Sequence, residues 1–368
     1  MNNSTKKILF LINDITAIGG TERMCTLIAN ELEQKGFEIC IISFFETKAL
    51  PFFILNAGIK RRQLVNTPPS SFAYLHLSSR IYRAVQQEQP SIIISCDTQM
   101  CLYSSLPLMT KKHVAWEHFN TSTVTWLGSR WFGRRMASLL CKKIVVLTES
   151  DKTQWMSTLQ TNANKLSVIP NLLPVTRVVN IDNSQRKKIV LAVGRMTEQK
   201  GFDLLIEAWQ KIPEQVREKW TLRIVGPNGS AKPKLEALIS SYHLEQSVEL
   251  IAGTANIKEE YQAASFYVLS SRYEGFGLTL IEAMGQGLAV IAFDCPMGPR
   301  EIIEDKYGIL LPAKDTVKLS LAIQNFMQNN QLRNNYSRLA HQRAENYTSS
   351  NIMCLWESMI QQLDKDAV

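Results

Sequence analysis

Short apolar runs alternate with stretches of helical periodicity along almost the whole chain. In the first half, near-continuous apolar runs predict six buried strands, at KILFLIND, FEICIISF, SIIISCD, KHVAWEH, KIVVLT and KLSVIPN. Helical stretches such as GTERMCTLIANELEQKG and HLSSRIYRAVQQEQ separate them. Strands that are apolar throughout and alternate with helices indicate a parallel sheet that is covered on both faces.

The pattern weakens once and then restarts. Residues 170–187 contain two prolines and no helical period, and we place the interdomain linker at 173–187. Six further strands are predicted, at KIVLAVG, WTLRIVG, VELIAG, FYVLSS, AVIAFD and GILLP. The final segment, 349–368, carries a helical apolar stripe with no strand after it, so it must pack back on another part of the protein. The predicted fold is α/β, with two Rossmann-like, doubly wound domains at 1–172 and 188–348 that face each other across a cleft.

Length, composition and charge narrow the class of protein. The chain has 368 residues, of which 45% are hydrophobic and 20% charged, as in a soluble protein with two domains. Residues 1–175 hold 19 Lys and Arg against 11 Asp and Glu, whereas the remainder holds 22 of each. The whole net charge of +8 therefore belongs to the first half. That half is expected to face an anionic partner, and anionic lipid, nucleic acid and phosphorylated substrates are all open at this point.

Cysteines and apolar segments predict a cytoplasmic location. The seven cysteines form no CxxC pair and lie mostly in apolar runs, which favours a reducing compartment. The first apolar run, Ile8 to Ile12, is too short for a signal peptide and suits a buried strand. A run of about 18 apolar residues, as needed to span a bilayer, does not occur.

Three predicted strand ends carry residues suited to ligand binding, because open α/β sheets bind ligands where strands end and helices begin. Gly19 and Gly20 precede a helix, where backbone N–H groups can approach a phosphate or sugar closely. Arg195 and Lys200 follow a strand and can converge on one diphosphate. Gly226 opens the turn GPNGS, which could lie under a nucleotide. Each feature taken alone is also compatible with an ordinary loop or a solvated surface charge.

The fourth strand end, SSRYEGFGLTLIEAMGQG, carries two glutamates beside a glycine turn. A helix starting near Leu278 presents N–H groups that can bind an anion. Glu274 and Glu282 are poor partners for a phosphate but good acceptors for sugar hydroxyls. A helix-capping Glu beside an exposed Glu is the plainer interpretation, but it leaves the GFG turn unexplained. The arrangement suits a ligand with a phosphate between two polyols, namely a nucleotide sugar.

These residues resemble a known family. EGFGLTLIEAMGQGLAVIAFD is similar to the E-x7-E signature of retaining glycosyltransferases with the GT-B fold, glycosyltransferase family four. The resemblance covers essentially the whole chain, and its R-x4-K and E-x7-E blocks are specific, whereas the Gly-Gly pair is weak. DCPMGPREII resembles the bacterial enzymes that assemble surface polysaccharide. Leu288 stands where the family usually has proline, which affects a turn and leaves the chemistry in place.

The resemblance assigns roles residue by residue. Glu274 would contact the donor sugar and Glu282 the ribose, while Arg195 and Lys200 would hold the diphosphate. His118, in VAWEHFN, would face the donor sugar near the reacting carbon, although a surface or core histidine is an equal alternative. The candidate catalytic residues are Arg195, Lys200, Glu274 and His118. The candidate donor-binding residues are Gly19, Gly20, Gly226, Glu274, Gly275, Phe276, Gly277, Leu278, Thr279 and Glu282.

The implied reaction is transfer of a hexose or N-acetylhexosamine with retention, in synthesis of O-antigen, capsule or exopolysaccharide. The donor would be a nucleotide sugar, most simply UDP-linked, and the acceptor a glycan or an undecaprenyl-diphosphate-linked oligosaccharide. The resemblance also implies a C-terminal helix that crosses back to the first domain. The strand ends show no cluster with metal-ligand spacing, so no metal and no cofactor are expected. The basic, aromatic segment 126–143 is predicted to touch an anionic inner-membrane surface on its cytoplasmic side, although a core-facing helix with solvated charges is as common.

Other functions remain open on sequence alone. A GDP-mannose-dependent mannosyltransferase would share the same motifs. A GT-B phosphorylase or a nucleotide-sugar epimerase is a second enzyme class, but no motif marks the lysine that a pyridoxal-dependent phosphorylase needs. A non-catalytic glycan- or nucleic-acid-binding module is a third class. Nucleic acid is not an expected partner, because the basic residues form no aromatic stacking platform.

Overall fold

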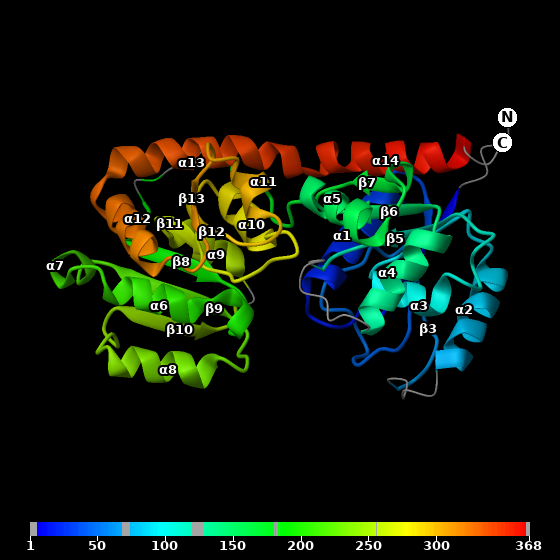
Figure 1. Ribbon diagram of the computed structural model, residues 1–368, viewed down its shortest axis with the longest axis horizontal. Helices are drawn as coiled ribbons and strands as arrows, with labels where there is room; N and C mark the ends of the chain where they lie inside the picture. Colours follow the sequence, from blue (N-terminus) through cyan, green and yellow to red (C-terminus); the bar gives the residue numbers. More distant parts are fainter. Residues whose placement is uncertain are drawn as a thin grey trace. The chain divides into compact units, whose positions relative to one another are not determined.

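The computed structural model divides into two compact units. The first consists of Met1–Pro174 and Ser349–Val368, and the second of Val175–Thr348. Each unit has its own parallel sheet with helices packed against it (Figure 1). The structure describes residues 6–67, 74–119, 128–179, 181, 183, 185–254 and 256–365.

The sheet of the first unit has seven parallel strands within the described residues, in the order β3-β2-β1-β4-β5-β6-β7. Their bounds are β1 Lys7–Ile12, β2 Glu38–Ser43, β3 Lys60–Gln63, β4 Ile92–Ser95, β5 His113–Trp116, β6 Lys143–Val146 and β7 Leu166–Val168. Six of them are the predicted apolar strands. The seventh, β3, reads KRRQ and carries no apolar signal, because it is an edge strand whose charged side chains remain in water.

Helices cover both faces of this sheet. On one face α2, α3, α4 and α5 contribute to two apolar clusters with the strands. The long helix α14, drawn in red in Figure 1, packs against α1. The helical bounds are α1 Gly20–Gln34, α2 Tyr74–Glu88, η1 Thr98–Met100, α3 Cys101–Ser104, α4 Ser129–Leu140, α5 Glu149–Leu159, η3 Ala163–Lys165 and α14 Ser349–Lys365.

The predicted return of the C-terminal helix is confirmed. The indole of Trp356 on α14 meets that of Trp116 edge to face, with ring centroids 4.9 Å apart. At the helix end, Asp364 pairs with Lys112 at 3.0 Å. Leu355 is 42% exposed, and the buried residues follow the helical period: Ile352, Met353, Trp356, Met359, Ile360 and Leu363. The C-terminal segment is thus part of the first unit's fold.

The second unit repeats the architecture with six described parallel strands in the order β10-β9-β8-β11-β12-β13. Helices α6, α8 and α12 build one large apolar cluster with the strands, while α10 and α13 pack on each other and against β12. The strands are β8 Ile189–Val193, β9 Thr221–Gly226, β10 Val248–Ala252, β11 Phe266–Leu269, β12 Ala289–Asp294 and β13 Ile309–Pro312. The helices are η4 Glu198–Lys200, α6 Phe202–Gln210, α7 Glu214–Arg217, α8 Lys232–Ser241, α9 Ile257–Ala263, α10 Leu278–Gly285, α11 Pro299–Ile303, α12 Thr316–Gln328, α13 Asn330–Ala344 and η5 Glu345–Tyr347. The structure thereby confirms the two predicted doubly wound α/β units.

Candidate active site

Glycines bring the strand ends of the second unit unusually close together. A Cβ on Gly226, at the end of β9, would lie 2.0 Å from the carbonyl oxygen of Gly194, at the end of β8. Gly201 has a φ of +61°, and its Cβ would lie 2.1 Å from the carbonyl oxygen of Ser270. No side chain fits in either gap, so these positions require glycine. The close packing fixes the loop that carries Arg195 and Lys200 against the end of β11.

Lys200 and Glu274 are 74 residues apart in sequence and form an ion pair. Lys200 Nζ lies 2.8 Å from Glu274 Oε1. Ser271 Oγ donates to the same carboxylate oxygen at 2.5 Å. Glu274 is only 5% exposed, so its charge is compensated by these donors and not by bulk water. Two of the predicted catalytic residues are therefore brought together at one edge of the sheet.

The GFG turn leads directly into α10. Gly277 is the N-terminal flanking residue of the helix, with a φ of +110°. Because the N-cap residue is a glycine, it provides no side-chain hydrogen bond to the first N–H groups of the helix. The backbone of Gly298 packs closely against the turn. A Cβ added at Gly298 would lie 1.7 Å from the carbonyl oxygen of Phe276. Phe276 is buried and packs edge to face on Tyr347, so its side chain anchors the turn. Because this side chain is buried, any contact of Phe276 with the donor would be made by its backbone.

Glu282 lies inside α10 and is buried. Tyr261 Oη donates to Glu282 Oε2 at 2.7 Å. Tyr267, on β11, donates through its hydroxyl to Thr279 Oγ1 at 2.7 Å. Burial raises the pKa of Tyr267, and the carboxylates of Glu274 and Glu282 raise it further, so the phenol remains a donor at neutral pH. Neither tyrosine lies in a sequence motif, so neither was predicted as a site residue.

A second network supports the loop from the outside. Arg272 donates to both carboxylate oxygens of Asp203 at 2.8 and 2.9 Å, and Lys234 pairs with the same carboxylate at 3.0 Å. Burial raises the pKa of Asp203, but the hydrogen bonds from Arg272 and Lys234 outweigh it and hold the pKa well below its usual range. Arg272 also donates to the carbonyl oxygen of Glu198, two residues before Lys200. The network therefore positions the turn that carries Lys200. Arg195, by contrast, has an exposed side chain at the end of β8.

The remaining predicted site residues belong to the first unit. Gly19 is the N-terminal flanking residue of α1, and Gly20 is the first residue of that helix. His118 follows β5, and its ring lies 4.3 Å from the ring of Trp116. Among the described residues, Nε2 of His118 is shielded from water without a hydrogen-bond partner. Burial lowers the pKa of His118 to about 4, against a smaller opposing effect of Glu117, so the imidazole is neutral at pH 7.

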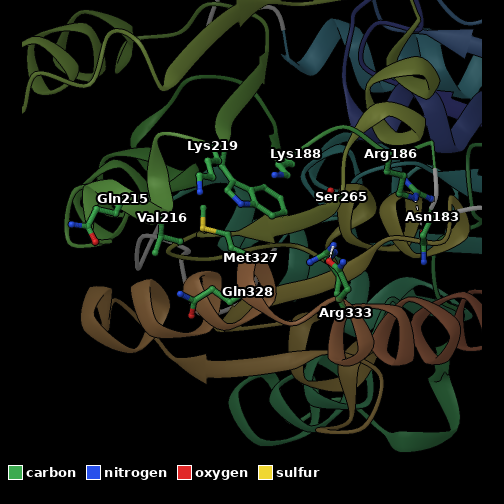
Figure 2. Close-up of a pocket in the computed structure, with 12 residues that line it drawn as sticks. Asn183, Arg186, Lys188, Gln215, Val216, Lys219, Ser265, Met327, Gln328 and Arg333 are labelled. Atoms are coloured by element: carbon green, nitrogen blue, oxygen red, sulfur yellow. Dashed lines mark hydrogen bonds between the residues drawn. The ribbon is translucent and has the colours of Figure 1, made fainter.

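A cavity of about 550 Å³ lies at the opposite edge of the second sheet, near the starts of β8, β9 and β11. Figure 2 shows that several of its lining side chains are basic or carry amides, among them Lys188, Lys219 and Gln328. None of the predicted donor residues lines it. Its lining is Asn183, Arg186, Lys188, Gln215, Val216, Lys219, Trp220, Ser265, Met327, Gln328, Asn330 and Arg333.

The segment predicted to touch a membrane corresponds largely to α4, and its positions 126 and 127 lie outside the described residues. Arg134 is not available to lipid, since it is buried and its Nε lies 2.5 Å from Glu117 Oε2. Arg130 pairs with Asp97 at 2.9 Å. Phe132 and Leu139 are exposed. Within the part of the chain that the structure describes, no helix combines the length and the apolar character needed to cross a bilayer.

Comparisons with known proteins place the chain in a family. A model described as Glycosyltransferase Family 4 matches residues 18–177, and one described as Glycosyl transferases group 1 matches residues 179–343. An uncharacterised glycosyltransferase of Haemophilus influenzae is 32% identical and aligns over 96% of this chain and 100% of its own length. The amylovoran biosynthesis glycosyltransferase AmsD of Erwinia amylovora is 28% identical, over 96% and 99%.

Solved structures agree on the fold. The lipopolysaccharide outer core galactosyltransferase WaaB superimposes with a TM-score of 0.77 at 19% identity, over 97% of this chain and 99% of its own. Anabaena HepE, solved in complex with UDP-glucose, gives a TM-score of 0.79 at 18% identity, over 98% and 99%. The relatives include enzymes of surface-polysaccharide synthesis. The chain therefore belongs to glycosyltransferase family 4, a retaining group of glycosyltransferases with the GT-B fold.

Proposed function

We propose that this glycosyltransferase transfers a hexose or N-acetylhexosamine from a UDP-sugar, with retention of anomeric configuration. The acceptor is a glycan or an undecaprenyl-diphosphate-linked oligosaccharide of O-antigen, capsule or exopolysaccharide synthesis. The observation that carries the proposal is the Lys200–Glu274 ion pair at the entrance to α10. The ammonium of Lys200 is suited to binding a diphosphate, and the carboxylate of Glu274 is suited to binding sugar hydroxyls. A single hydrogen bond connects the two groups.

The leaving diphosphate is neutralised by groups of the protein itself. Arg195 can fork onto two phosphate oxygens, and Lys200 acts as a compact positive charge beside them. The first turn of α10, after Gly277, adds backbone N–H groups and the positive end of the helix dipole. Fixed donors of this kind stabilise the charge that develops on the leaving group, and we infer that transfer proceeds without a metal ion.

The two glutamates hold the sugars on either side of that charge. Glu274 accepts from donor-sugar hydroxyls, and its hydrogen bonds from Lys200 and Ser271 hold its carboxylate in one orientation. Glu282, which also accepts from Tyr261, accepts from a ribose hydroxyl. The imidazole of His118 is neutral and therefore has one donor and one acceptor nitrogen, which suits a hydrogen bond with a sugar hydroxyl.

The donor nucleotide is proposed to be UDP because HepE, which shares the fold, was solved with UDP-glucose. AmsD, a relative over almost its full length, is named for the synthesis of amylovoran. The proposed membrane contact of segment 126–143 rests on its exposed Phe132 and Leu139 and on Lys142 and Lys143, without Arg134. Sedimentation with anionic vesicles tests it; binding that is independent of salt and of lipid charge contradicts it.

A thermal-shift screen of UDP, GDP, ADP, CDP and their sugars tests the donor. A ligand that binds only the native state raises the melting temperature according to RT ln(1 + [L]/Kd). We expect stabilisation by UDP and by one UDP-sugar, unchanged by EDTA. Stabilisation by GDP instead moves the donor to GDP-mannose. Loss of the effect in EDTA that Mg²⁺ restores refutes the metal-independent mechanism. A protein that responds to none of the nucleotides is a binding module and not this enzyme.

A further inference from the structure

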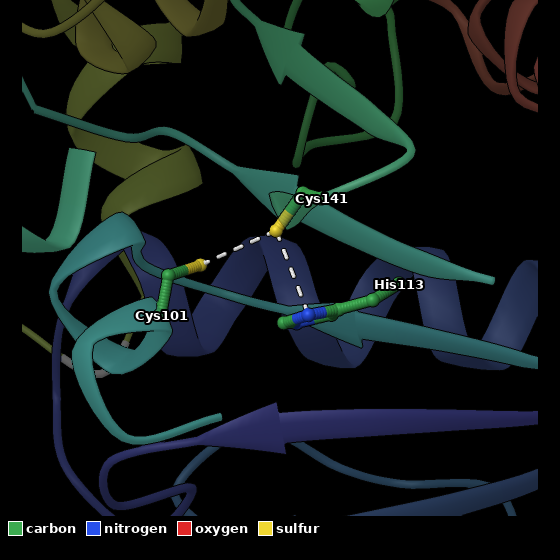
Figure 3. Close-up of side chains that lie close together, drawn as sticks. All are labelled: Cys101, His113 and Cys141. Carbon is green, nitrogen blue, oxygen red and sulfur yellow. Dashed lines mark hydrogen bonds between the residues drawn. The ribbon is translucent and has the colours of Figure 1, made fainter. Parts of the chain in front are cut away.

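Three buried side chains that can bind a metal ion meet in the first unit, and none of them is a predicted site residue. They are Cys101, His113 and Cys141 (Figure 3). Cys101 is the first residue of α3, His113 is the first residue of β5, and Cys141 directly follows α4. Their ligand atoms all lie within 4.8 Å of one another. The cluster thus joins two helices to the start of a central strand.

The distances from Cys141 to its neighbours are close to those of a tetrahedral zinc site. Cys141 Sγ lies 4.0 Å from Cys101 Sγ, 3.5 Å from His113 Nδ1 and 3.6 Å from Ser105 Oγ. Zinc–ligand distances of about 2.3 Å for sulfur and about 2.1 Å for nitrogen or oxygen give tetrahedral edges of roughly 3.8 and 3.6 Å. These three distances from Cys141 agree with such edges to within about 0.2 Å. The ligand atoms of Cys101 and His113 lie within 4.8 Å of each other, so a bound ion would draw them together. Ser105 supplies an oxygen for the fourth position, which water could also fill.

The histidine is oriented for metal binding by its second ring nitrogen. His113 Nε2 lies 2.8 Å from Ser95 Oγ. When the Nε2 proton is donated to this hydroxyl, the lone pair of Nδ1 faces Cys141. Metal-bound histidines are commonly held in the correct tautomer by such a partner.

The charge of the site also favours a divalent ion. Two thiolates and one Zn²⁺ sum to zero, so the filled site buries no net charge, and binding releases two thiol protons to solvent. Thiolate and imidazole ligands suit zinc. A disulfide is a poorer description, because its sulfur atoms would have to approach to about 2.05 Å. We propose that Cys101, His113 and Cys141 bind one structural Zn²⁺ that fastens α3 and α4 to the first sheet.

The test uses the full chain with the exposed Cys354 replaced by serine, so that no surface thiol binds metal. Chelator-treated protein is titrated with Zn²⁺, and the bound metal is counted by mass spectrometry. We expect one equivalent, with a higher melting temperature. The absorption spectrum of the same chain loaded with Co²⁺ identifies the ligand types without mutating them. We expect a thiolate-to-cobalt charge-transfer band. Ser95→Ala, which leaves all three ligands in place, should weaken zinc binding roughly 10-fold.

A neighbouring thiol pair supplies the matched control. Cys96 lies within hydrogen-bonding reach of Cys25, and both are buried. Cys96→Ser should retain the zinc, whereas Cys141→Ser should lose it. The proposal is overturned by substoichiometric zinc, by a cobalt spectrum without charge transfer, or by equal loss in the two variants. A Cys101–Cys141 disulfide in the intact mass, or uptake of copper(I) but not of zinc, overturns it as well.

Discussion

Removal of the Lys200 ammonium should affect stability and catalysis through the same carboxylate. At 2.8 Å the Lys200–Glu274 pair has a gross Coulomb energy of about 6 kcal/mol with an effective dielectric constant of 20. Desolvation of the two groups offsets part of this energy. Lys200→Ala leaves Glu274 buried with Ser271 Oγ still donating to it. We therefore expect a loss of about 3 kcal/mol in the free energy of unfolding, at the lower end for a broken buried pair.

The control is a second Lys–Glu pair in the same unit. Lys211 and Glu207 lie 2.6 Å apart, but their side chains are 33% and 41% exposed. Lys211→Ala should cost less than about 1 kcal/mol, since exposed pairs contribute little. Urea unfolding of both variants measures the difference. The reasoning is refuted if the two variants lose equal stability.

A double variant separates the structural role from the catalytic one. Lys200→Met with Glu274→Gln removes both charges while keeping similar volumes. We expect it to regain most of the lost stability, because no unpaired charge remains. Its kcat should stay lower than that of the parent by roughly 100-fold, because the cation at the leaving group is still missing. Recovery of turnover together with stability would contradict the proposed role of Lys200.

Three further predictions use other parts of the structure. Gly201→Ala should cost about 2 kcal/mol or more, because φ is +61° and the new Cβ meets the Ser270 carbonyl; a smaller loss in urea unfolding would count against the packing described. Tyr261→Phe should raise the KM for the donor, because Glu282 loses its 2.7 Å donor, and an unchanged KM would argue against Glu282 as a ribose ligand. His118 has a folded pKa of about 4, below its unfolded value of about 6.5, so the unfolded state binds the proton first and stability falls as the pH drops through that window. His118→Gln should flatten that part of the stability–pH curve, and an unchanged slope would contradict the assignment.

The sequence predicted most of the architecture because the buried strands are uniformly apolar. Where a strand contributes little to the core, the signal vanishes, as for the polar edge strand β3. The helical stripe of 349–368 predicted a helix that packs back. The stripe alone did not predict that Leu355 is exposed while Leu363 is buried, because this depends on the surface against which the helix packs.

The candidate site was predicted as separate motifs, not as contacts. R-x4-K and E-x7-E each stand out in the sequence, but the hydrogen bond between Lys200 and Glu274 arises only from the neighbouring positions of β8 and β11 in the sheet. For Arg134, the sequence pattern gave a wrong expectation about exposure. Its charge was counted toward a basic surface, yet Glu117 pairs with it in the interior. The spacing of Cys101, His113 and Cys141 likewise follows no local motif, because three different elements bring them together.

The most direct test asks which of two basic regions of the second unit binds the nucleotide. Calorimetric titration of UDP into the wild-type chain is compared with Arg195→Ala and Lys200→Ala, and with Lys188→Ala and Lys219→Ala in the cavity at the opposite edge. We predict that the first two variants weaken binding by about 10-fold or more, since each loses a charged hydrogen bond, while the last two bind like the wild type. Loss of binding in the Lys188 and Lys219 variants, with Arg195→Ala and Lys200→Ala unaffected, would contradict the proposed donor site.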